Sequence, residues 1–181
     1  KLMKLYSTNN KENIVDLKTA VLNGLAEDEG LFMPIKIPKM KKEFFENIEK
    51  LSFQEIAFEV AKQLFSEDIS VKKLKHIIDE TINFDAPLVK IEENIYCLEL
   101  FHGPTLAFKD FGARFMSRLI SYFNKKETLI LVATSGDTGS AVAHGFYNIP
   151  GIKVVLLYPS AKVSKIQEQQ LTTMGGNIQA L

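Results

Sequence analysis

The chain has 181 residues with 22 basic and 22 acidic side chains, so its formal net charge is zero. Nucleic-acid-binding proteins usually carry a basic excess that neutralises phosphates, and membrane-surface helices gather Lys and Arg on one face. Neither pattern is present, so we expect no nucleic-acid and no membrane partner. The composition, 46% hydrophobic and 24% charged, is typical of a globular protein.

The first half of the chain carries more charge and less glycine than the second. Residues 1–85 hold 13 + 15 = 28 charged residues and 2 glycines, whereas residues 86–181 hold 9 + 7 = 16 charged residues and 8 glycines. The change falls near Pro87, which disfavours helix at the residue before it. We therefore predict two domains, residues 3–85 and 86–181.

Helices are predicted for most of the first half. Residues 12–23 place apolar side chains close to a period of 3.6, and residues 28–40, with one glycine and two prolines, should be extended or turned. Further along, Ser52-x-x-Glu55 is a capping box before an apolar helical face, and Ser70 precedes another such face. This half is predicted to be a small helical domain without catalytic residues.

The second half alternates between strand and helix patterns. The expected strands are residues 88–91, 95–100, 128–133 and 153–158, and the expected helices are residues 108–123, 139–148 and a helix opened by Ser164-x-x-Gln167. Strands and helices joined by short loops are typical of a parallel sheet with right-handed crossovers, so the predicted fold class is α/β. The chain stops where a further strand begins, and we expect it to be part of a longer protein.

Two segments lie where such sheets bind ligands. Lys109 falls in the first turn of the helix at residues 108–123, where the helix dipole and apolar neighbours favour a neutral amine, the form that Schiff-base chemistry requires. Taken alone, a solvated surface lysine is the more common explanation. Asp110 is explained as a favourable first-turn acid.

The second segment, residues 134–140, follows a predicted buried strand at its carboxyl end. Its small residues and two glycines suit the binding of a carboxylate or phosphate, although a plain strand-to-helix turn is an equal alternative. The triplet Asp137-Thr138-Gly139 also occurs in aspartic proteases, but these need two such triplets, and this chain has one.

Metal binding and disulfides are not expected. Cys97 is the single cysteine, so no internal disulfide can form, and Cys97 with His102 has no zinc-site spacing. We interpret Cys97 as a strand core residue and His144 as structural. With no signal-peptide pattern at the start of the sequence, the expected location is the cytoplasm.

Together, the stretch His102-Gly-Pro-Thr-Leu-Ala-Phe-Lys109-Asp-Phe-Gly-Ala-Arg-Phe115 and the loop Thr134-Ser-Gly-Asp-Thr-Gly139 closely resemble the threonine synthase family, whose members are fold-type II enzymes dependent on pyridoxal 5′-phosphate (PLP). The resemblance extends over essentially the whole chain, from Lys4-Leu-Tyr-Ser-Thr8 to Gly175-Gly-Asn177. It implies a helical N-terminal domain followed by the first part of a three-layer, parallel-sheet PLP domain of the tryptophan synthase β-like type.

The resemblance also implies the site residues. Lys109 is the catalytic lysine that binds PLP covalently, and Asp137 is the cofactor-binding residue that faces the PLP ring. The residues implied to receive the substrate carboxylate are Ser135, Gly136, Thr138 and Gly139. The implied reaction converts O-phospho-L-homoserine and water to L-threonine and phosphate.

Three questions stay open from the sequence. In this family the loop that holds the PLP phosphate lies beyond residue 181, so we expect the isolated chain to be inactive and to retain PLP weakly. Another fold-type II enzyme, such as a threonine dehydratase, would share the lysine and a similar loop, and a non-catalytic paralogue would share the fold. The oligomeric state is not predicted.

Overall fold

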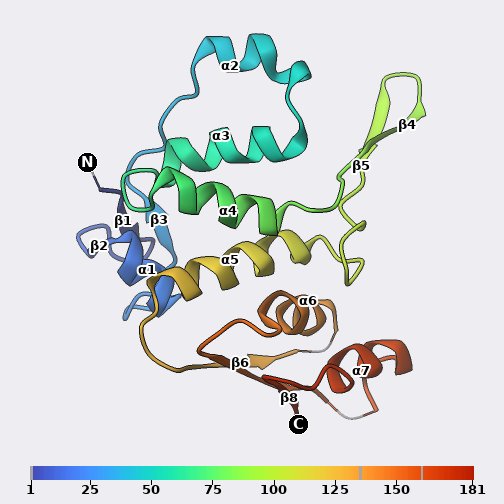
Figure 1. Ribbon diagram of the computed structural model, residues 1–181. Coiled ribbons are helices and arrows are strands. Elements are labelled where there is room, and N and C mark those ends of the chain that lie inside the picture. The colour runs from blue at the N-terminus through green and yellow to red at the C-terminus, as the bar shows by residue number, and fades with distance from the viewer. Residues whose placement is uncertain (1, 135, 160) are drawn as a thin grey trace. The chain divides into compact units, whose positions relative to one another are not determined.

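The computed structural model describes residues 2–134, 136–159 and 161–181. The chain divides into two compact units, Lys1–Ile82 and Asn83–Leu181, and each is considered by itself (Figure 1). Within the described ranges, no helix is both long and apolar enough to cross a membrane.

The first unit contains an antiparallel sheet that helical periodicity did not predict. Its strands are β1 (Lys4–Ser7), β2 (Ile14–Asp16) and β3 (Phe32–Pro34), in the order β2-β1-β3. The helix expected over residues 12–23 begins only at Leu17, as α1 (Leu17–Asn23), because the residues before it pair with β1. Asp16 ends β2 and caps α1 by accepting a hydrogen bond from the Thr19 amide at 2.8 Å.

The rest of the first unit is helical. Its helices are α2 (Lys42–Asn47), a short 3-10 helix (Ile48–Lys50), α3 (Phe53–Phe65) and α4 (Val71–Thr81). The predicted capping box is confirmed, because the Glu55 amide donates to Ser52 Oγ at 3.3 Å and the Ser52 amide donates to Glu55 Oε2 at 2.7 Å. Ser70 occupies the N-cap of α4 without a side-chain capping bond.

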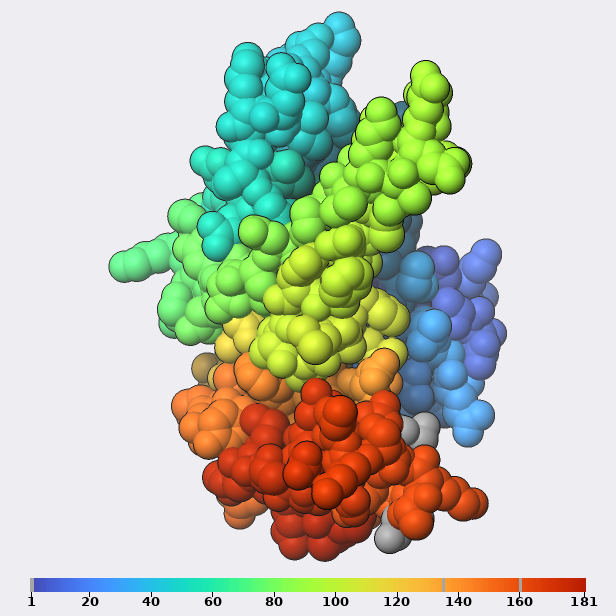
Figure 2. Space-filling view, turned by 90° about the vertical axis from the view of Figure 1, so that its right-hand side faces the viewer, coloured from blue at the N-terminus to red at the C-terminus, as the bar shows by residue number. Residues whose placement is uncertain are grey.

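The second unit begins with a two-stranded antiparallel hairpin, β4 (Leu88–Glu92) and β5 (Ile95–Leu98), turned at Asn94 with φ +62°. Every residue of both strands is exposed, and the yellow-green hairpin stands out from the surface in Figure 2. The prediction that Cys97 is a core residue is therefore wrong. Strand periodicity indicates a strand but does not determine whether another layer covers it.

A parallel sheet follows, which confirms the α/β fold class. Its strands β6 (Thr128–Ala133), β7 (Ile152–Leu157) and β8 (Ile178–Ala180) lie in the order β6-β7-β8. The helices of this unit are α5 (Lys109–Phe123), α6 (Asp137–Phe146) and α7 (Lys165–Thr172). The predicted capping box formed by Ser164 and Gln167 opens α7 and is also confirmed.

The core of this unit lies between the sheet and α6. Val154 and Leu156 of β7 and Phe146 of α6 are 0–1% exposed. Helix α6 approaches α5 closely at Gly145, where an added Cβ would lie 3.0 Å from the Ala113 carbonyl carbon. The Ser117 hydroxyl, fully buried on α5, lies 2.7 Å from Gly145 O and ties the two helices together.

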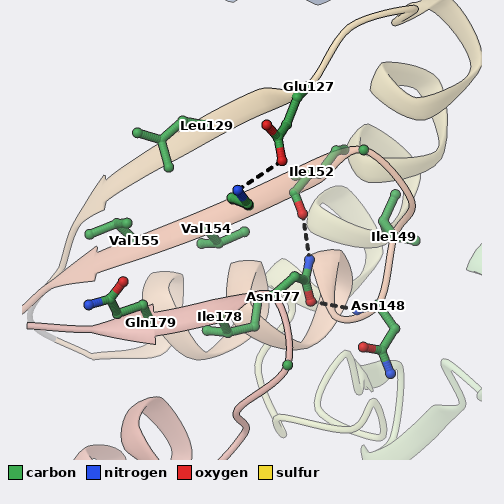
Figure 3. A pocket seen from close by; sticks show the side chains of 13 residues that line it. Glu127, Leu129, Asn148, Ile149, Ile152, Val154, Val155, Asn177, Ile178 and Gln179 are labelled. Atoms are coloured by element: carbon green, nitrogen blue, oxygen red, sulfur yellow. Dashed lines mark hydrogen bonds and ion pairs between the residues drawn. The ribbon is translucent and has the colours of Figure 1, made fainter.

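Asn177 ties together the segments at the amino ends of β7 and β8 (Figure 3). Its Nδ2 donates to Phe146 O and to Ile152 O, both at 2.9 Å, and its Oδ1 accepts from the Asn148 amide at 2.7 Å. A pocket of about 650 Å³ lies over these strands. Asn177 thus joins the end of α6, the start of β7 and the approach to β8 through one side chain.

Candidate active site

Lys109 is the first residue of α5, as the sequence predicted within one residue. Its side chain is half-buried, and Nζ lies 4.5 Å from the centroid of the Phe108 ring. An ammonium group at that distance interacts favourably with the face of an aromatic ring. Phe108 occupies the N-cap of α5 and supplies no side-chain hydrogen bond to it.

The loop from Thr134 to Gly139 turns the chain from β6 into α6. Thr134 Oγ1 accepts from the amides of Gly136 at 3.2 Å and Gly139 at 2.9 Å. A Cβ on Gly139 would lie 2.2 Å from Thr134 Cγ2, so this position requires glycine. Ser135, one of the predicted substrate-binding residues, lies outside the described residues.

A polar cavity of about 420 Å³ opens between this loop and the start of α5. It is lined by Lys109, Ala133, Thr134, Gly136, Asp137, Thr138 and Gln167. One cavity is therefore lined by residues that the sequence analysis predicted from two separate segments, namely Lys109, Gly136, Asp137 and Thr138. Gly139 is buried behind Thr134 and does not line it. The substrate-binding roles of Gly136, Thr138 and Gly139 stay predictions.

Gln167 is a residue of this cavity that the sequence did not indicate. Its backbone amide belongs to the capping box of α7, while its side-chain Nε2 lies 3.4 Å from Asp137 Oδ1, to which it donates. A Cβ on Gly136 would lie 2.8 Å from the same Nε2. The capping pattern predicted a helix start but carried no information about which loop the glutamine would meet.

A second, apolar cavity of about 540 Å³ adjoins α5 and α6. Lys109 and Thr138 line it as well as the polar cavity, and the remaining lining residues are Leu100, Phe108, Phe111, Gly112, Ala113, Met116, Ala141 and Val142. The Lys109 side chain thus lies at the boundary between a polar and an apolar environment.

Asp110 and His144, for which the sequence predicted no catalytic role, are both partly or fully buried. Asp110 is completely buried, with both carboxylate oxygens accepting hydrogen bonds from Thr105. His144 on α6 is half-buried, and its Nδ1 is buried without a hydrogen-bond partner among the described residues. Burial lowers the pKa of His144 below its ordinary value, and the charge of Arg114 lowers this pKa further.

Metal-ligating side chains do not gather anywhere in the described ranges, where no group of three or more His, Cys, Asp and Glu residues could hold an ion. The chemistry-bearing groups of the cavity are one amine, one carboxylate, one amide and hydroxyls. The chain is thus an α/β protein with a polar cavity lined by a lysine at a helix start and by a loop at the carboxyl end of a parallel strand, which is where such sheets bind ligands.

Comparison with known proteins identifies what the chain is similar to. The sequence model described as "Threonine synthase N terminus" matches residues 4–82. Threonine synthases from Buchnera aphidicola (of Schizaphis graminum) and Escherichia coli are 46% and 41% identical over 182 and 180 residues, each covering 99% of this chain. Over nearly its whole length the chain is therefore similar to one part of the threonine synthases.

Solved structures show the same similarity. The crystal structure of threonine synthase from Escherichia coli superposes with a TM-score of 0.89 at 41% identity, over 99% of this chain. The crystal structure of PLP-bound threonine synthase from Brucella melitensis superposes with a TM-score of 0.91 at 32% identity, over 98% of this chain. The chain spans about 42% of the length of the curated relatives and 40–42% of these structures.

Proposed function

We propose that this protein is a PLP-dependent threonine synthase, which converts O-phospho-L-homoserine and water to L-threonine and phosphate. The observation that carries the proposal is the meeting of Lys109 and Asp137, from two separate segments, at one polar cavity. The identity to threonine synthases at 41–46% over nearly the whole chain supports the particular reaction. A location in the cytoplasm belongs to the same proposal.

The residues of the cavity suit PLP. A volume of about 420 Å³ falls within the ~300–1,000 Å³ of typical ligand pockets. Lys109 supplies the primary amine that a carbonyl cofactor requires. At the start of α6, the amides of Asp137 and Thr138 have no intrahelical acceptor and are suited to an anionic group of a ligand. The glycine at position 136 allows Gln167 to lie close to the loop, because a Cβ there would lie 2.8 Å from Gln167 Nε2.

In this proposal Lys109 holds the cofactor, and Asp137 faces its ring. PLP, when bound, supplies an electron sink for negative charge that develops on substrate carbons. Lys109 Nζ takes up and returns protons at those carbons, which requires the amine in its neutral form. The apolar cavity adjoins Lys109 on the side of α5 and α6. Gln167 orients the Asp137 carboxylate by donating to Oδ1.

The test measures phosphate release from O-phospho-L-homoserine by the full-length protein supplied with PLP. Lys109→Ala should lower the rate by at least about a hundredfold, since general acid–base catalysis alone contributes that much. Lys126→Ala, at an exposed lysine outside the cavity, is the matched control and should leave the rate unchanged. Equal phosphate release with and without Lys109 would overturn the proposal.

Two further outcomes separate the alternatives. A protein that releases ammonia from L-threonine but no phosphate from O-phospho-L-homoserine would be a dehydratase. One that binds PLP through Lys109 and turns over neither substrate would be a non-catalytic member of the fold. Because the chain spans about 42% of its relatives' length, we expect turnover from the full-length protein and not from the 181-residue chain alone.

A further inference from the structure

We propose that Asp110 is a positioning residue that holds Lys109 at the cavity by clamping the loop that precedes α5. The Asp110 carboxylate is completely buried. The Thr105 amide donates to Oδ2 at 2.9 Å and the Thr105 hydroxyl donates to Oδ1 at 2.7 Å, so both oxygens bind the same residue five positions earlier. This clamp folds the chain back on itself immediately before the reactive lysine.

The clamp leaves no space for a side chain at position 103. A Cβ on Gly103 would lie 2.5 Å from Asp110 Oδ2 and 2.9 Å from the Phe84 ring. Neither group can yield easily, because the carboxylate is fixed by two hydrogen bonds and the Phe84 ring packs on Phe111, with centroids 4.6 Å apart. The glycine at position 103 is therefore explained by the position of the Asp110 side chain.

The clamped loop also contains a backbone conformation that its own sequence does not favour. Leu106 has φ +61°, in the left-handed region that residues other than glycine, asparagine and aspartate rarely adopt. Its side chain is 70% exposed, so burial of that side chain does not hold the conformation. Hydrogen bonds hold the conformation instead. The Leu106 amide donates to Gly103 O at 3.1 Å, and Thr105 donates twice to Asp110.

The consequence for Lys109 follows from the chain order. Asp110 is the next residue, and its amide donates to Ala107 O at 3.0 Å, which sets the first turn of α5. If the carboxylate were removed, Leu106 could return to an ordinary conformation, and the start of α5 would shift or fray. Lys109 would then lose the fixed backbone that directs its side chain to the boundary of the two cavities.

The first test measures the clamp by amide hydrogen exchange on the full chain. Asp110→Ala should speed exchange at the Thr105 and Leu106 amides by about tenfold to a hundredfold, as expected for the loss of hydrogen bonds to a charged group. Thr105→Val removes only the hydroxyl donor and should speed exchange by about tenfold, whereas Thr105→Ser, which keeps both donors, should restore the slow exchange. The Val variant keeps the test valid if Asp110→Ala fails to fold.

A matched control lies in the other unit. Asp28 also accepts two hydrogen bonds, from Ser7 Oγ at 2.6 Å and from the Gly30 amide at 3.0 Å. Asp28→Ala should speed exchange at Gly30 and leave the Thr105 and Leu106 amides unchanged. If exchange at Thr105 and Leu106 does not respond to Asp110→Ala or Thr105→Val, the clamp does not exist.

The second test measures the position of Lys109. It rests on the proposed function only because PLP is used as the probe. PLP is added, the adduct is reduced with borohydride, and labelling of Lys109 is compared with that of exposed Lys126 by peptide mapping. The clamp variants should lower this ratio, and Thr105→Ser should restore it. Faster exchange with an unchanged ratio would overturn the positioning role. Lack of preference for Lys109 in the wild-type chain would count against the proposed function, while the exchange test still decides the clamp.

Discussion

Replacing Asn177 by alanine should destabilise the second unit without touching the candidate active site. The substitution removes three hydrogen bonds, two to the carbonyls of Phe146 and Ile152 and one from the Asn148 amide. An intramolecular hydrogen bond contributes about 1 kcal/mol net. The two carbonyl bonds are part-buried and the third is exposed, so we expect a loss of about 2–3 kcal/mol in the free energy of unfolding.

Asn177→Asp should cost at least as much, because an ionised side chain of the same shape cannot donate to either carbonyl. The measurement is urea-induced unfolding, monitored by hydrogen exchange at the amides of strands β6–β8. These amides report on the second unit alone. Gln179→Ala, an exposed position on β8, is the control and should stay within about 0.5 kcal/mol of wild type. An Asn177→Ala variant as stable as this control would refute the reasoning.

Three other substitutions test the packing behind the cavity and between α5 and α6. Gly139→Ala places a Cβ 2.2 Å from Thr134 Cγ2 and should cost about 1–3 kcal/mol of stability, measured by urea unfolding; a neutral effect would show that the loop can shift freely. Ser117→Ala removes the buried hydroxyl that lies 2.7 Å from Gly145 O, but Arg118 Nη1 still donates to this carbonyl at 2.8 Å, so the loss in the same assay should be about 0.5–1.5 kcal/mol; a loss well above about 2 kcal/mol would show that the arginine does not keep the carbonyl paired. Because the pKa of His144 is lowered in the folded chain, the unfolded chain takes up the proton first as the pH falls below 6.5, and stability falls with it. His144→Gln should therefore reduce the loss of melting temperature between about pH 7.5 and about pH 5.5, and an unchanged loss would assign the pH dependence to other groups.

The elements of the second unit were predictable because their signals are local. Strands β6 and β7 are short apolar runs, and the Ser164 capping box marks the start of α7 within its own first turn. The sheet β2-β1-β3 was missed because its strands have only 3–4 residues, and β1 pairs with β3 across helix α1 in the sequence. Short strands carry too few alternations to compete with a helical period.

For the candidate site too, residues with a local sequence signal were predicted, and residues placed by packing were missed. Lys109 and the loop at residues 134–140 were found because each follows a predicted strand or opens a predicted helix. Asp110 was taken for an ordinary first-turn acid, since neither its burial nor the left-handed backbone at Leu106 has a signal in the local sequence. Gln167 reaches Asp137 only through the packing of α7 beside α6, across 30 residues of sequence.

The two ends of the parallel sheet offer different opportunities to protein engineering. Asn177 secures the amino ends of β7 and β8, whereas Lys109 and Asp137 gather beyond the carboxyl end of β6. Among the described residues, Asn177 shares no hydrogen bond with Lys109 or Asp137, so the effects of substitutions at the two ends on the free energy of unfolding should add. A library confined to the Asn177 end could therefore raise thermal tolerance first, and the gain would then absorb destabilising changes made around Lys109 to alter substrate choice.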